Sequence, residues 1–374
     1  MRVLFDHQAF TIQSRGGISR YVVELGQQLA TLPQTELRLA AGWHRSLLLN
    51  ENPPDWACGR YLAPWPRTGP LRHAINTRLS QRVVHRWRPD VIHETYFRPG
   101  TAYHPDVPTV LTIHDLIYFI LPLKGGEADR TRRAQAAAIA RADHLICISE
   151  TTRRDLVRLF PDTVSRTSVI PHGRPASISR PVAPRPLAEP YFLFVGLRQR
   201  YKNFDRVLQA LAASAHLRTH FNLVAFGDAP FTPADMARLG TLGLDPQRIL
   251  HRTGDDATLA RYYAHASALV FPSLYEGFGM PLLEAMTYGC PVVCSDRGAL
   301  PEVAGAAALY FDPEAPGELV QALTQLTSDP ALAADLRARG HEQSARFSWA
   351  RCAQETREVY GRVMSARGRD AASI

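Results

Sequence analysis

The chain has 374 residues, of which 45% are hydrophobic and 21% are charged, and its formal net charge is +8 at pH 7. This length is too great for one ordinary core, so two domains are expected, with the composition of a soluble globular protein. Charge interrupts residues 1–6 too early for a signal peptide, and the most apolar segment, residues 110–123, is too short to cross a bilayer. We therefore expect a cytoplasmic protein.

The cysteines, histidines and acidic residues show no pattern typical of a metal site. The five cysteines are scattered and odd in number, which argues against a disulfide framework and for a reducing cytoplasm. The 14 histidines show no tight ligand spacing, and the sequence contains no Asp-x-Asp. We therefore expect no dedicated metal ion.

The positive charge is carried almost entirely by arginine. Of the 43 basic residues only Lys124 and Lys202 are lysines, so the arginines reflect genome composition and a retained lysine is more informative. The charge suits an anionic ligand or the inner face of an anionic membrane. The sequence has no basic and aromatic motif for nucleic acid, so no nucleic-acid partner is expected.

The first half of the chain alternates strand and helix patterns. Residues 2–5 predict a first strand, and Gly16 and Gly17 precede a helix that begins near Tyr21. Such a glycine pair either cradles an anion or forms a plain turn and cap, and both interpretations stay open. Further strands are predicted at residues 37–41, 90–93, 109–113 and 144–148, and a strand with a turn at residues 169–173. Helices are predicted at residues 71–87, 130–141 and from 149 onward, and an irregular loop at residues 50–70.

The helix predicted at residues 71–87 carries an apolar stripe and a basic stripe. The stripes consist of Leu71, Ile75, Leu79 and Val83, and of Arg78, Arg82 and Arg86. One interpretation is peripheral contact with an anionic membrane or an anionic acceptor. The other is a helix of the domain core whose arginines flank its buried face.

His114 and Asp115 stand directly after the strand predicted at residues 109–113. In open α/β sheets the carboxyl edge carries the ligand sites. A single histidine is often structural, but this position makes His114 a candidate for a functional role.

The second half of the chain repeats the α/β rhythm after a proline-rich segment, which predicts a linker. Strands are predicted at residues 191–195, 221–226, 268–271, 291–294 and 309–311, helices at residues 204–211 and 259–265, and mostly helix at residues 319–364. Two successive α/β domains suggest a cleft between two parallel sheets. We assign residues 1–175 to an N-terminal domain, 176–190 to the linker, 191–350 to a C-terminal domain and 351–374 to a C-terminal helix that returns to the N-terminal domain.

The stretch at residues 268–286 is the most informative part of the chain. A buried strand leads into a loop with Gly277 and Gly279, and Pro281 stands in the first turn of a helix. Glu276 lies in the loop and Glu284 on the helix, with seven residues between them. A helix N-terminus attracts an anion and carboxylates accept hydrogen bonds from hydroxyls, so a phosphorylated ligand with hydroxyl groups is expected.

These residues, in this order, resemble a known family. The motifs are Phe271-Pro-Ser-Leu-Tyr-Glu-Gly-Phe-Gly-Met-Pro-Leu-Leu-Glu-Ala-Met286, Gly16-Gly-Ile-Ser-Arg-Tyr21, Thr112-Ile-His-Asp115, Gly196 with Lys202-Asn203, and Phe347-Ser-Trp349. Nearly the whole chain resembles the retaining glycosyltransferases of the GT-B type, with two Rossmann-like domains whose parallel sheets face each other across a cleft. The resemblance is to family 4, also called glycosyl transferases group 1, and particularly to its mannosyltransferases.

The resemblance implies a role for each matching residue. Glu276 would face hydroxyls of the transferred sugar, Lys202 and Arg198 would neutralise the diphosphate, and His114 would approach the sugar near the reacting carbon. Glu284 would hold the ribose, and further donor contacts are implied for Gly196, Asn203, Gly227, Gly277, Phe278, Gly279, Met280 and Leu282. An acceptor or phosphate loop is implied at Gly16, Gly17 and Asp115.

Two positions depart from the family pattern. Leu197 follows Gly196 where many members have an arginine, so the phosphate role of Arg198, one place later, is in question. Ser19 stands in the glycine loop where the family often has a glycine.

The implied reaction is metal-independent transfer of a hexose with retained anomeric configuration. The favoured donor is GDP-mannose, and no other cofactor is expected. The acceptor would be a saccharide or a lipid-linked saccharide in bacterial surface polysaccharide synthesis. A UDP-sugar donor and a non-catalytic protein that binds a sugar nucleotide are the alternatives. A hydride-transferring enzyme would need Gly-x-Gly-x-x-Gly after the first strand, and the sequence lacks it.

Overall fold

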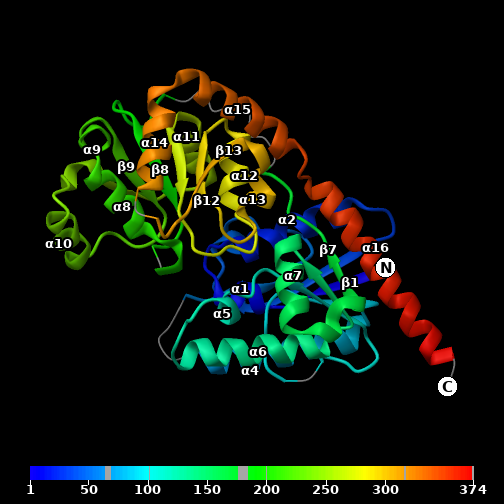
Figure 1. Ribbon diagram of the computed structural model, residues 1–374. Coiled ribbons are helices and arrows are strands. Elements are labelled where there is room, and N and C mark those ends of the chain that lie inside the picture. The colour runs from blue at the N-terminus through cyan, green and yellow to red at the C-terminus, as the bar shows by residue number, and fades with distance from the viewer. Residues whose placement is uncertain (64–68, 101, 176–183, 199, 316, 373–374) are drawn as a thin grey trace. The chain divides into compact units, whose positions relative to one another are not determined.

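The computed structural model describes residues 1–63, 69–100, 102–175, 184–198, 200–315 and 317–372. The chain forms two compact units, which are Met1–Gly173 with Ser348–Ile374, and Arg174–Phe347. Each unit contains one parallel sheet with helices on both faces (Figure 1). The predicted pair of Rossmann-like domains is confirmed. Of the linker predicted at residues 176–190, residues 176–183 lie outside the described residues.

The sheet of the first unit has seven strands in the order β3-β2-β1-β4-β5-β6-β7. Its strands are β1 (Arg2–Phe5), β2 (Glu36–His44), β3 (Ala57–Tyr61), β4 (Val91–Glu94), β5 (Thr109–Ile113), β6 (His144–Cys147) and β7 (Thr167–Val169). The strand order reverses between β1 and β4, and loops after the strands there are the usual place for a ligand.

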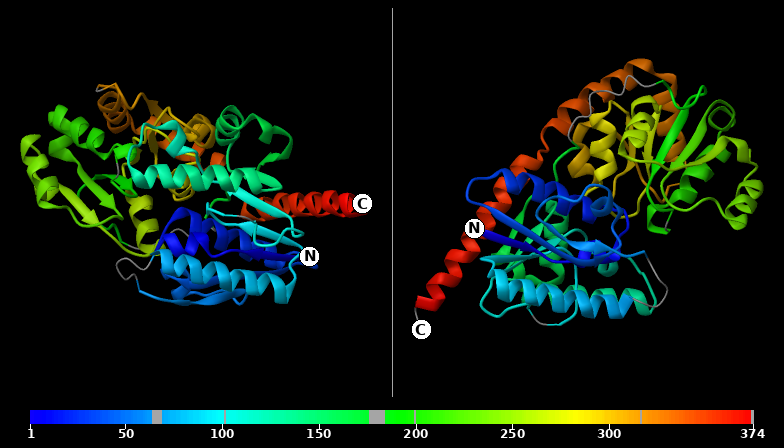
Figure 2. Two further views of the ribbon diagram at one scale, coloured as in Figure 1. Left: turned by 90° about the horizontal axis from the view of Figure 1, so that it is seen from below. Right: turned by 180° about the vertical axis from the view of Figure 1, so that it is seen from behind.

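The helices of the first unit cover both faces of its sheet (Figure 2). They are α1 (Gln8–Ile12), α2 (Gly17–Thr31), α3 (Leu47–Glu51), α4 (Gly69–Trp87), α5 (Ile117–Ile120), α6 (Gly126–Arg141), α7 (Glu150–Leu159) and α16 (Trp349–Ala372). On one face, Tyr21 of α2 contacts Thr112, and the hydroxyl of Tyr360 on α16 lies 2.6 Å from Nδ1 of His93. On the other face, α4, α6 and α7 supply apolar side chains to two adjoining cores.

The buried face of α4 differs from the predicted one. Leu71, from the predicted apolar stripe, is 63% exposed, and Ile75, Leu79 and Val83 are only half-buried. The side chains of Asn76 and Ser80 are fully buried instead. The amide of Asn76 bonds the backbone N–H and C=O of Trp43, and Ser80 bonds His7, so β2 and the β1–α1 turn supply polar partners. Membrane contact by this helix stays a prediction.

Two edge strands were not predicted. Strand β3 lies inside the predicted irregular loop of residues 50–70, where it pairs with β2 through a register shift between Ala40 and Gly42. The chain here has alternating small, polar and aromatic residues, and pairing with β2 rather than local hydrophobicity makes it a strand. In the second unit β10 (Ile249–Arg252) is likewise an edge strand, and it pairs in parallel with β9 (Asn222–Phe226) in an unbroken register.

The second unit has a six-stranded sheet in the order β10-β9-β8-β11-β12-β13. Its other strands are β8 (Tyr191–Val195), β9 (Asn222–Phe226), β11 (Ala268–Phe271), β12 (Val292–Ser295) and β13 (Ala308–Phe311). Its helices are α8 (Phe204–Ala213), α9 (Ala215–His220), α10 (Pro233–Thr241), α11 (Asp256–His265), α12 (Met280–Thr287), α13 (Leu300–Ala304), α14 (Glu318–Ser328) and α15 (Pro330–Ala345). Strands β8, β9 and β11 are buried on both sides, as expected for a parallel sheet between two layers of helices.

Candidate active site

The carboxyl edge of the second sheet is built from glycine turns. Gly196 follows β8 with φ +119°, and Gly227 follows β9 with φ +91°. Both conformations favour glycine, and a Cβ atom built on Gly227 would lie 3.9 Å from the backbone of Gly196. The structure therefore brings these two predicted donor residues side by side and keeps bulky atoms away from the strand ends.

Lys202 and Glu276 form an ion pair at this edge. Nζ of Lys202 lies 2.7 Å from Oε1 of Glu276, and the two side chains are 16% and 13% exposed. Lys202 ends a short 3-10 helix (Arg200–Lys202), and Glu276 lies in the β11–α12 loop. The N–H of Leu274 donates to the C=O of Tyr201 at 2.8 Å, which ties the two segments together. A cation and a carboxylate are thus held at a surface that solvent and a ligand can reach.

The backbone of Glu276 is fixed by the loop that follows β12. Its C=O accepts from the N–H of Ala299 at 3.0 Å. A Cβ atom on Gly298, which has φ +61°, would lie 2.5 Å from that same oxygen. A side chain at position 298 would displace Glu276, so the close approach requires glycine.

The first turn of α12 places most of its apolar side chains away from this edge. Gly279 caps the helix with φ +102°, and Pro281 stands in the first turn. Phe278 packs edge-on against Phe347, and Leu282 is fully buried. Phe278 and Leu282 could therefore contact a donor only through their backbone. The predicted donor contacts of both residues stay predictions.

Glu284 lies on the buried face of α12, where it is 7% exposed. The hydroxyl of Tyr263, on α11, donates to Oε2 of Glu284 at 2.8 Å. The Tyr263 side chain is fully buried, and its ring stacks on that of Tyr288 with centroids 6.1 Å apart. No local motif marks Tyr263 in the sequence, because a contact between two helices leaves none.

The hydrogen-bond partners of Arg198 lie in the β9–α10 loop. Its backbone N–H donates to Asp228 at 2.7 Å, and its guanidinium donates to the C=O of Ala229 at 2.8 Å. The guanidinium carbon lies 4.5 Å from the ring centre of Phe231. Arg198 thus orders the β9–α10 loop, while its phosphate role stays a prediction.

His114, at the carboxyl end of β5 in the first unit, is 6% exposed. Its ring lies edge-on to Tyr21, with centroids 5.0 Å apart, and 6.0 Å from the ring of His172. Burial lowers its pKa to about 3, so the imidazole is neutral at pH 7. Nε2 of His114 has no hydrogen-bond partner among the described residues. An unsatisfied buried nitrogen is uncommon in folded proteins, so His114 stays a candidate for a functional role.

The predicted glycine loop and Asp115 have structural partners. Gly16 caps α2, and the amide of Gln13 fills the space beside it. The Ser19 hydroxyl donates to the C=O of Gly16 at 3.0 Å, so the serine that departs from the family pattern braces the turn. Asp115 accepts from the N–H of Ile117 at 3.1 Å at the start of α5. The predicted acceptor or phosphate role of these residues stays untested.

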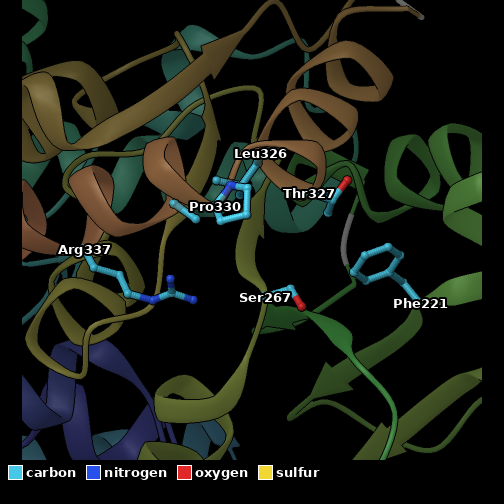
Figure 3. A pocket seen from close by; sticks show the side chains of 7 residues that line it. Phe221, Ser267, Leu326, Thr327, Pro330 and Arg337 are labelled. Carbon is cyan, nitrogen blue, oxygen red and sulfur yellow. The ribbon is translucent and has the colours of Figure 1, made fainter.

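A hollow on the second unit lies at the opposite sheet edge (Figure 3). Phe221 and Ser267, which stand immediately before β9 and β11, line it together with Arg337. The amino ends of the strands meet here, whereas Gly196, Gly227 and Glu276 follow the carboxyl ends. We therefore place the candidate site by its side chains and not by this hollow.

Two features are absent from the described residues. No cluster of three or more His, Cys, Asp or Glu side chains there could hold a metal ion. None of the described helices is both long enough and apolar enough to cross a membrane.

The architecture defines the GT-B class, in which two Rossmann-like domains follow each other. Sucrose-phosphate synthase from Thermosynechococcus elongatus has this fold, with a TM-score of 0.76 and 21% identity over 98% of this chain and 99% of its own. Two family models also match the sequence. They are Glycosyltransferase Family 4 at residues 15–177 and Glycosyl transferases group 1 at residues 177–343.

The chain belongs to glycosyltransferase family 4, the glycosyl transferases group 1. A relative, O-antigen chain mannosyltransferase B from Escherichia coli, is 30% identical over 92% of this chain and 95% of its own length. Another, alpha-maltose-1-phosphate synthase from Mycolicibacterium smegmatis, is 28% identical over 97% of this chain and 100% of its own. The protein is thus a glycosyltransferase, and relatives of similar identity carry different names.

Proposed function

We propose that the protein transfers a hexose from a nucleotide sugar to a saccharide or lipid-linked saccharide in bacterial surface polysaccharide synthesis. GDP-mannose is the favoured donor, because the relative with 30% identity is named a mannosyltransferase. The observation that carries the proposal is the Lys202–Glu276 pair beside the glycine turns of the second sheet. It offers a cation for a diphosphate and a carboxylate for sugar hydroxyls in one place.

Each group has a defined role in the proposed reaction. Lys202 neutralises the diphosphate as the bond from the anomeric carbon to the phosphate oxygen breaks. Glu276 accepts hydrogen bonds from the hydroxyls of the sugar and stabilises positive charge on its ring. The resemblance assigns the neutral His114 imidazole a contact with the sugar near the reacting carbon. The acceptor hydroxyl forms the new bond on the face that the diphosphate leaves, its proton passes to the departing phosphate, and the anomeric configuration is retained.

The charge of the diphosphate is met by Lys202 and by the N-terminus of α12, so we propose that the reaction needs no metal ion. Chelation with EDTA should then leave the rate unchanged. A requirement for added Mg²⁺ would contradict this part of the proposal.

The test begins with the donor. GDP-mannose, UDP-glucose and related sugar nucleotides are compared by thermal shift, because a ligand that binds the native state raises its melting temperature. The donor that binds is then incubated with saccharide and lipid-linked acceptors, and release of nucleoside diphosphate is measured. A protein that binds a donor and never transfers its sugar would favour the non-catalytic alternative, and a preference for UDP-sugars would replace the favoured donor.

Lys202→Ala should lower kcat/KM by about 10²- to 10³-fold, the usual loss when one group that stabilises transition-state charge is removed. Lys124→Ala is the matched control, because Lys124 is the other lysine and is exposed in the first unit. Glu276→Ala should also lose transfer while the fold is kept. Full activity in both site variants would overturn the assignment, and a product of inverted configuration, seen by NMR, would overturn the mechanism.

A further inference from the structure

Glu284 is held by a side chain that none of the family motifs contains. Its carboxylate is nearly buried on α12, and a buried carboxylate is stable only where donors satisfy it. Tyr263 of α11 supplies such a donor, with its hydroxyl 2.8 Å from Oε2. The contact joins two neighbouring helices of the second unit and lies outside the Lys202–Glu276 pair.

Tyr263 is well suited to fix the direction of that carboxylate. Its ring is fully buried and nearly parallel to that of Tyr288, at 14° between the planes, so its hydroxyl has little freedom to move. Each carboxylate oxygen can accept more than one hydrogen bond, so the bond from Tyr263 does not prevent Oε2 from accepting another. The neighbouring hydroxyls of a ribose need both oxygens in a set orientation.

We infer that Tyr263 is a positioning residue that orients Glu284 to bind the ribose of the nucleotide, and that it thereby sets the preference for ribose over 2′-deoxyribose. The inference rests on the proposed function, in which Glu284 holds that ribose. Tyr263 itself does not touch the donor. It acts on binding alone, so its loss raises the KM for the donor and leaves kcat unchanged.

The experiment compares GDP with 2′-deoxy-GDP, or UDP with 2′-deoxy-UDP where UDP binds more tightly, by isothermal titration calorimetry. Wild-type protein should prefer the ribonucleotide. Tyr263→Phe removes only the hydroxyl and should weaken ribonucleotide binding by about tenfold, the size of one charge-assisted hydrogen bond. Its affinity for the deoxynucleotide should stay within about twofold of wild type, since that ligand uses Glu284 less.

Tyr191→Phe is the matched control. Tyr191 is a second fully buried tyrosine of the same unit, and its hydroxyl donates to the C=O of Tyr262 at 2.7 Å. It loses a comparable buried hydrogen bond without touching Glu284, so its ribose preference should equal that of wild type. A double-mutant cycle adds Glu284→Gln, in which Tyr263→Phe should have no further effect on the preference.

The outcomes separate the inference from the proposed function. If wild-type protein binds neither GDP nor UDP, or binds ribo- and deoxynucleotide equally, the assigned donor site is wrong and the inference fails with it. If wild type prefers the ribonucleotide and Tyr263→Phe keeps that preference, only the inference is overturned. An equal loss of preference in Tyr191→Phe also overturns it, because general loosening of the unit would then explain the effect.

Discussion

At the carboxyl edge of the first sheet, Asp6, Glu94 and Arg98 are almost completely buried, whereas at the same edge of the second sheet Lys202 and Glu276 remain accessible. Glu94 forms ion pairs with the guanidinium groups of Arg98 and of Arg141 on α6. At the edge of the first sheet, the charged groups bond buried protein partners. At the edge of the second sheet, Lys202 and Glu276 bond each other at a place where a ligand can compete for both.

The buried network of the first edge is continuous. Arg98 lies 3.9 Å from the ring centre of Tyr103, and the hydroxyl of Tyr103 donates to Oδ2 of Asp6 at 3.1 Å. The other oxygen of Asp6 accepts from the N–H of Thr95 at 2.9 Å. Such a network is costly to break, because each group left behind stays buried without its partner. The polar groups of the first edge therefore stabilise the fold, whereas Lys202 and Glu276 of the second edge remain accessible to a ligand.

The largest expected effect comes from breaking the buried network. Glu94→Gln leaves two guanidinium groups without their buried counter-charge, and should lower the free energy of unfolding of the first unit by about 3–5 kcal/mol. Hydrogen exchange followed by mass spectrometry measures each unit separately. Glu276→Gln is the control and should change the second unit by less than about 1 kcal/mol, since its ion pair is partly exposed. Equal losses in the two variants would contradict the distinction.

The second largest expected effect is a loss of stability of the first unit in acid. Burial lowers the pKa of His7, His93 and His114 to about 3, from the usual 6.5. Below pH 6.5 the unfolded chain therefore binds protons that the folded unit does not, and stability falls as the pH falls. Each histidine contributes about 1.4 kcal/mol per pH unit, so these three together should cost the unit about 4 kcal/mol between pH 7.5 and 5.5.

Two buried carboxyl groups oppose this acid effect. Burial raises the pKa of Asp6 and of Glu94, so the folded state binds their protons before the unfolded state does, and they offset part of the loss. Hydrogen exchange at pH 7.5, 6.5 and 5.5 should show amides of the first unit losing protection before those of the second. Earlier loss in the second unit would show that the buried histidines do not control acid stability.

The smallest expected effect is a change in nucleotide affinity at the accessible edge of the second sheet. In the free protein Glu276 holds Lys202, so a diphosphate must compete with a carboxylate for that cation. Glu276→Gln weakens this competition and should raise the affinity for a nucleoside diphosphate without sugar by up to about fivefold, the value of a partly exposed ion pair. The same variant should transfer sugar more slowly, because an amide stabilises positive charge poorly.

Calorimetric titration with GDP or UDP measures this change. The double variant Glu276→Gln with Lys202→Ala is its control, and should abolish the gain because the cation is gone. Weaker nucleotide binding in Glu276→Gln alone would mean that Lys202 and Glu276 act on the diphosphate together rather than in competition.

Local chemistry made part of the fold and site predictable from the sequence. The apolar run of β11 favours a buried strand, Gly279 allows the positive φ of the turn, and Pro281 fixes φ in the first turn of α12. Their order therefore predicted the strand, the loop and the helix that place Glu276 and Glu284. The resemblance to family 4 then pointed to Lys202, which the structure places against Glu276.

Other features depended on partners that are distant in the chain. Strand β3 exists because β2 offers it an edge, and Asn76 is buried because the backbone at Trp43 bonds its amide. Apolar periodicity alone therefore assigned the wrong buried face to α4. The bond between Tyr263 and Glu284 joins residues 21 positions apart on two helices, and no short motif encodes it.

The sequence by itself predicted two α/β domains, because hydrophobic periods and glycine turns are local features, and the order of its motifs carried the resemblance to glycosyltransferase family 4. Only the tertiary structure decided which polar groups are buried in fixed networks and which remain accessible. That distinction depends on the distances between side chains from different elements, since a charge is stable in the interior only where the fold brings it a partner.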